Sequence, residues 1–163
     1  MLLIAIFACA FAAPAFSQQT LPAFLVIAKN YKYLKNVGGK EVAVPVQRLQ
    51  RSAASYDVVN SEYYEEDYES YFISFYIPEG EILAAYDKDG KLIRTAEKYK
   101  NVKLPEAVTK AVVTRFPNWS IANDVYMVNY FENTGKTTKT YKLVLKNETK
   151  RIRVETNEKG EFS

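Results

Sequence analysis

Residues 68–98 read YESYFISFYIPEGEILAAYDKDGKLIRTAEK, and most of the predicted architecture follows from this stretch. Its first ten residues alternate with the period of a strand that has two different faces. One face holds Tyr71, Ile73, Phe75 and Ile77, and the other holds Tyr68, Ser70, Phe72, Ser74 and Tyr76. Residues 78–80 and 87–90 are turn sequences, and the second ends in the Asp-Gly pair that suits a tight hairpin. The stretch therefore predicts three consecutive antiparallel strands, over residues 68–77, 81–86 and 91–98.

A helix is predicted on each side of these strands, over residues 45–56 and 105–116. Each helix begins at a proline, which is tolerated in the first turn. Pro117 follows the second helix and ends it. Apolar residues recur at spacings of three or four, so that each helix has one apolar stripe. The stripes are Val46, Leu49, Ala53 and Tyr56 in the first helix, and Leu104, Val108, Ala111 and Val112 in the second.

Four more strands are predicted, over residues 24–34, 120–131, 138–146 and 150–156. The prolines that open the two helices, Pro45 and Pro105, are each followed by strands and then by a turn glycine, Gly90 or Gly160. This order predicts an internal repeat, with units at about residues 40–98 and 103–163. The predicted fold class is α+β: an antiparallel sheet of two tandem helix-plus-meander repeats, with two helices packed on one face.

The first residues have the pattern of a cleaved secretory signal. Residues 2–13 are apolar but too few to span a bilayer, and Ala15-Phe16-Ser17 is a small-x-small cleavage sequence. We therefore expect a signal peptide over residues 1–17 and a single mature domain over residues 18–163. This domain is expected to be periplasmic or secreted and not to span a membrane.

The composition excludes several classes of enzyme. The chain has no histidine, and its one cysteine, Cys9, lies in the expected leader. The commonest general base, metal ligand and thiol nucleophile are therefore missing from the mature protein. We predict no catalytic residues, no metal site and no cofactor. The net charge of +3 and the lack of a known motif do not indicate nucleic-acid binding.

The second helix and its flanks resemble a known family. The resemblance is carried by Leu104-Pro105, Arg115-Phe116-Pro117 and Trp119, and by the strand–turn–strand sequence at residues 85–92, which is repeated around Gly160. It is a resemblance to the PepSY-like exported domains. These domains are related in fold to the β-lactamase-inhibitor protein. The resemblance covers most of residues 40–163 and implies tandem repeats, export and no catalysis. Related domains have been proposed to inhibit peptidases or bind proteins, and the family has no catalytic set to carry over.

The candidate binding site is a set of aromatic residues outside the predicted core. Tyrosine offers a large rigid contact area with a polar tip, as at protein-binding hot spots. The candidates are Tyr63, Tyr64, Tyr68, Phe72 and Tyr76. The alternative is that these residues only suit a pleated sheet. The expected function is a non-catalytic binding or inhibitor-like module, whose exposed sheet face engages a protein or envelope component.

Two other functions stay open at this point. Glu66 and Asp67, with a lysine, could serve a hydrolase or transferase that acts on an envelope polymer. The basic residues between Lys136 and Arg153 could instead contact anionic surface polymers in an accessory structural role. In that segment Lys142 and Lys146 have the opposite parity from the apolar residues, which is typical of the solvated side of a strand.

Overall fold

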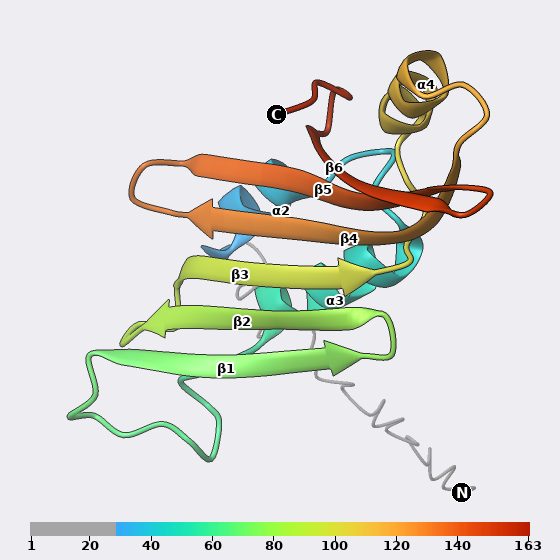
Figure 1. The fold of residues 1–163 in the computed structure, drawn as a ribbon. Coiled ribbons are helices and arrows are strands. Elements are labelled where there is room, and N and C mark those ends of the chain that lie inside the picture. Colours follow the sequence, from blue (N-terminus) through green and yellow to red (C-terminus); the bar gives the residue numbers. More distant parts are fainter. Residues whose placement is uncertain (1–28) are drawn as a thin grey trace, which may run out of the picture.

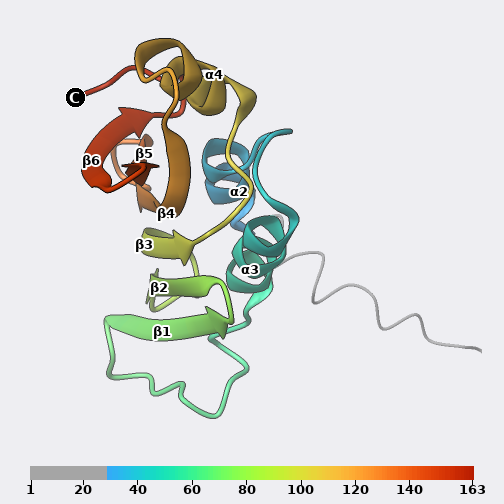
Figure 2. The same cartoon turned by 45° about the vertical axis from the view of Figure 1, so that its right-hand side comes forward.

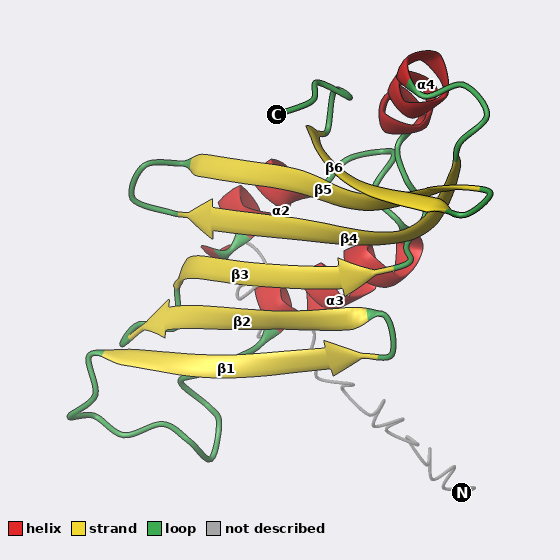
Figure 3. Ribbon diagram, in the orientation of Figure 1, coloured by secondary structure: helices red, strands yellow, loops and turns green. Residues whose placement is uncertain are grey.

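The computed structural model describes residues 29–163 and confirms the α+β class. Six strands form one antiparallel sheet in sequence order, so that each strand pairs with the next along the chain (Figures 1 and 3). The strands are β1 (Ser70–Ile77), β2 (Gly80–Asp87), β3 (Leu92–Lys100), β4 (Ser120–Phe131), β5 (Lys136–Asn147) and β6 (Lys150–Asn157). The six strands predicted after residue 60 are confirmed.

In the described part of the chain three helices accompany the sheet: α2 (Tyr31–Val37), α3 (Val44–Ser55) and α4 (Glu106–Arg115). Helices α2 and α3 cover one face of the sheet, and no helix of residues 29–163 covers the opposite face, which we call the helix-free face (Figures 1 and 2). Helix α4 lies at the β6 end, beside the C-terminal segment. Within residues 29–163 no helix combines the length and apolar character that a membrane crossing requires.

The core lies between the sheet and the two covering helices. Tyr99, Tyr126 and Tyr141 are opposite one another on β3, β4 and β5, and their rings stack with centroids 5.9 and 4.5 Å apart. All three are buried, as is Tyr86, whose hydroxyl donates to the carbonyl of Ala53 in α3. Tyrosine fills this core because its ring packs on the pleated surface. We call this side the helix-covered face.

One predicted element is wrong where the structure describes it. Residues 31–34 belong to helix α2 and not to the strand expected over residues 24–34. The alternation of Tyr31 and Tyr33 suggested a strand, but Tyr31 is exposed. The buried residues are Tyr33 and Val37, which are four apart as on one side of a helix. Residues 29 and 30 are not in a strand either, while residues 24–28 and the signal peptide predicted over residues 1–17 lie outside the described residues.

Candidate functional site

Strand β1 carries the most exposed of the candidate aromatic side chains. Its burial alternates as predicted: Tyr71 is buried, while Phe72 and Tyr76 are 68% and 69% exposed. The last two lie on the helix-free face, next to Leu83 of β2, which is 47% exposed. Large apolar groups left in water side by side are typical of a contact surface rather than of a sheet that only needs to fold.

The loop before β1 carries the other three candidates. It consists of successive tight turns, in which the N–H groups of Ser61, Tyr64 and Tyr68 each donate to the carbonyl three residues earlier. Tyr64 is half-buried and stacks on Tyr71 with ring centroids 5.6 Å apart. Tyr64 thus lies outside the cluster of buried core residues, but its ring packs against that cluster and is less exposed than those of the other four candidates.

A pocket of about 440 Å³ lies between this loop and β1. Its lining comes from Tyr63 and Tyr68 of the loop and from residues 70–74 of the strand, including Phe72. Tyr63 and Tyr68 are 60% and 51% exposed. The structure thus brings three of the five predicted residues together. Tyr76 lies farther along β1, beside a second hollow of about 220 Å³ that also includes Lys98 and Lys100.

The chain segment that contains β1 and the loop before it carries only negative charge. Residues 52–87 contain nine acidic residues and no basic residue, while the rest of the chain holds all 22 basic and the other ten acidic residues. Among the described residues none of these nine takes part in an ion pair. Glu66 and Asp67 are exposed and make no side-chain hydrogen bond there. The hydrolase alternative pairs them with a lysine, and no described lysine forms an ion pair with either carboxylate.

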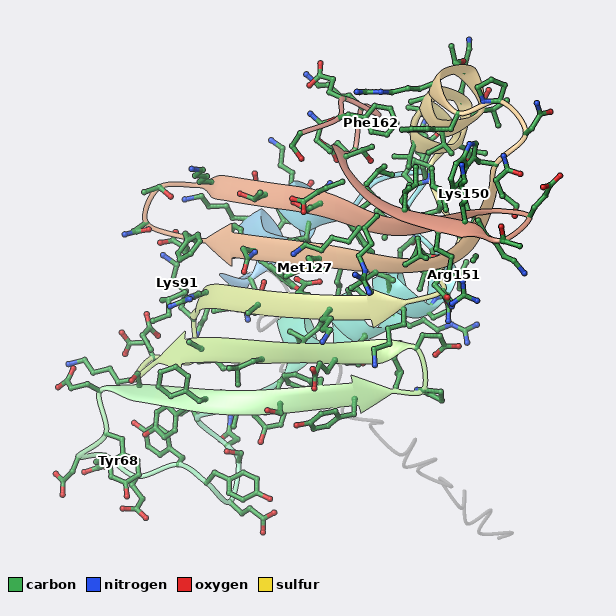
Figure 4. All side chains as sticks on the ribbon, in the orientation of Figure 1. Tyr68, Lys91, Met127, Lys150, Arg151 and Phe162 are labelled. Carbon is green, nitrogen blue, oxygen red and sulfur yellow. The ribbon has the colours of Figure 1, made fainter. Side chains whose placement is uncertain are left out.

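The other end of the helix-free face is basic. The strand register places eight exposed cations on the helix-free face as a whole, together with Glu81, Asp87 and Glu155, and five of the cations belong to β5 and β6. The cations are Arg94, Lys98, Lys100, Lys136, Lys142, Lys146, Arg151 and Arg153. Figure 4 shows Arg151 and Tyr68 well apart, with Tyr68 at the lower left below β1 and Arg151 at the right-hand side of the sheet. A pocket of about 590 Å³ adjoins this end, and its charged lining residues are Arg115, Lys142, Arg153 and Glu155.

The sequence patterns do not single out one buried carboxylate, that of Glu97. Glu97 of β3 is 3% exposed and accepts four hydrogen bonds of 2.8–2.9 Å. The donors are Tyr33 of α2, Gln50 of α3, and Thr95 and Tyr99 of β3. Burial raises the pKa of Glu97, and these hydrogen bonds partly oppose that rise. Through the hydrogen bonds from Tyr33 and Gln50, the Glu97 carboxylate joins both helices to the sheet. Because it is closed off from solvent, it cannot contact a substrate from the outside.

The described residues hold no cluster of three or more acidic, histidine or cysteine side chains placed to bind a metal ion. No protein-family model, curated protein or solved structure matches the chain.

Proposed function

We propose that this protein is a non-catalytic exported module that binds a protein or envelope component through the helix-free face of its sheet. The observation that carries the proposal is that Phe72 and Tyr76 lie on the same face of β1, on either side of Ser74, and are more than two-thirds exposed. Aromatic anchors of this kind dominate the binding energy of protein interfaces. Tyr63 and Tyr68 extend the same surface across the pocket beside the strand.

Partner capture from envelope extracts tests this proposal. The variant Tyr68→Ser, Phe72→Ser, Tyr76→Ser should lose capture, while its melting temperature stays within a few degrees of that of the parent protein. The matched control is Tyr31→Ser, Val44→Ser, Val113→Ser, which removes apolar side chains of similar exposure from the three helices. This control should capture the partner normally. Equal capture by both variants would exclude the β1 aromatics as the site.

The two-repeat layout and the PepSY-like relationship are part of the proposal. In their support, Asp87 accepts hydrogen bonds from the N–H groups two and four residues later, and Asn157 does the same. The pairing of Ser70 with Asp87 across β1 and β2 recurs as that of Thr140 with Asn157 across β5 and β6. Such a correspondence is expected of a duplicated unit in which β4 is an insertion. Export to the periplasm or beyond is the part of the proposal that rests on the signal sequence at residues 1–17.

The basic end of the helix-free face favours a second candidate function, contact with anionic surface polymers. Within residues 29–163 the whole face carries eight exposed cations and three carboxylates, and of these cations only Lys142 pairs with a carboxylate of the face, Glu155, at 3.9 Å. Binding to a polyanion such as heparin should weaken steeply as the salt concentration rises. It should also weaken in Arg151→Gln, Arg153→Gln. Retention that salt does not change would contradict this candidate.

A further inference from the structure

Strand β1 is an open edge of the sheet. It pairs only with β2, and no backbone hydrogen bond joins its outer side to another described segment. The opposite edge is different, because the C-terminal segment pairs with the end of β6 through Thr156 and Phe162, and Ser163 donates to Glu155. An unpaired edge presents alternate N–H and C=O groups that can accept a further strand.

The charges beside this edge indicate which kind of segment could pair with it. The loop beside β1 exposes Glu62, Glu65, Glu66, Asp67 and Glu69. A basic segment would relieve the repulsion among these carboxylates, while an acidic one would add to it. The charge also disfavours a second copy paired β1 to β1, because both edges would be negative.

We propose that β1 binds an extended basic segment of a protein partner, which adds to the sheet as a seventh strand. This inference rests on the proposed function and names the partner's chemistry. Backbone pairing along residues 70–77 supplies affinity that does not depend on sequence. Side chains on one side of the added strand lie beside Phe72 and Tyr76. Its basic side chains reach the carboxylates of the loop, and the pocket lined by Tyr63 and Tyr68 accepts an apolar side chain.

The test uses three short peptides of equal length and the full mature protein. The first peptide alternates Lys and Val, the second alternates Glu and Val, and the third is the Lys–Val peptide with every second amide N-methylated. N-methylation keeps the charge but removes the donors of one strand edge. We expect the Lys–Val peptide to bind at least about tenfold more tightly than either of the others. It should also slow hydrogen exchange of the outward β1 amides and leave β6 unchanged.

Variants that remove the acidic charges of the loop provide an independent test. Glu65→Gln, Glu66→Gln, Asp67→Asn should weaken Lys–Val binding about tenfold, as three exposed charge interactions are lost. The control Glu41→Gln, Glu106→Gln, Glu148→Gln removes the same charge outside residues 52–87 and should change binding less than about twofold.

Several outcomes would overturn the inference. Equal binding of the N-methylated peptide would exclude strand addition, and equal binding of the Glu–Val peptide would exclude a basic partner. Protection of the β1 amides that rises with protein concentration alone would make a second copy the occupant. In each of these cases the loss of partner capture by the Phe72 and Tyr76 substitutions still tests the proposed function separately.

Discussion

The phenolic oxygen of Tyr71 makes two hydrogen bonds with the backbone of Glu65: it accepts from the N–H at 3.2 Å and donates to the carbonyl. A buried side chain of β1 therefore fixes the loop that carries Tyr63 and Tyr68. The ring of Tyr68 lies 6.1 Å from that of Tyr71, centroid to centroid. The candidate site is thus pre-organised by the core and does not depend on the loop alone.

Tyr71→Phe should release this loop while the sheet stays folded. The free energy of unfolding should fall by about 1–2 kcal/mol, because the hydrogen bonds are lost and the ring is kept. Amides of residues 57–69 should exchange faster, as measured by hydrogen exchange with mass spectrometry. The matched control is Tyr76→Phe, which removes an exposed hydroxyl and should change neither quantity. Unchanged exchange in Tyr71→Phe would show that other contacts hold the loop.

The regular elements could be predicted because they depend on short-range patterns. Each predicted strand after residue 60 begins and ends within two residues of the observed one, and each predicted helix within one. Helix α2 could not be predicted in this way. Its seven residues contain only two buried side chains, and the period of a helix does not emerge from so short a stretch.

The candidate site was predictable in part. The alternation in β1 correctly separated Phe72 and Tyr76 from the core. What the sequence could not show was that β1 is an edge strand, or that Tyr64 folds back onto Tyr71. The hydrogen bonds to Glu97 were also hidden, since two of its donors come from helices much earlier in the chain. The one local indication in the sequence is that Thr95 and Tyr99 lie two residues before and after Glu97, on the same side of β3.

Glu97 should make stability depend on pH in an unusual direction. Because burial raises the pKa of Glu97, the folded state binds a proton more tightly than the unfolded state. The free energy of unfolding should therefore fall as the pH rises from about 4.5 to the folded-state pKa. Glu97→Gln has no such proton to bind, so its urea-unfolding curve should lose this part of the slope. Burial also raises the pKa of Asp124, so Asp124→Asn serves as the comparison. If Glu97→Gln and the parent protein showed the same pH dependence of the free energy of unfolding, Glu97 would not be the group that causes this slope.

Glu132 should show the opposite dependence. Hydrogen bonds from Lys91 and Lys32, at 2.9 and 3.2 Å, lower the pKa of Glu132 and join α2 to the end of β4. This contribution is present above the unfolded pKa and is lost as the pH falls through the lowered value. Glu132→Gln should lower the free energy of unfolding by less than about 1 kcal/mol at pH 7, since both lysines are partly exposed. The difference should shrink at high salt and disappear at low pH.

The contact between α4 and the C-terminal segment depends on one glycine. Gly160 has φ +79°, and a Cβ there would lie 2.6 Å from the carbonyl oxygen of Ala107 and 2.8 Å from the Cβ of Ala111. Gly160→Ala therefore combines an unfavourable backbone conformation with a clash that moves α4. The control is Gly135→Ala, which has φ +64° but only Lys32 nearby, at 3.8 Å. We expect urea unfolding to show a loss of about 1 kcal/mol for Gly135→Ala and at least twice that for Gly160→Ala. Equal losses would mean that the backbone conformation alone sets the cost, and that α4 is free to move away from the C-terminal segment.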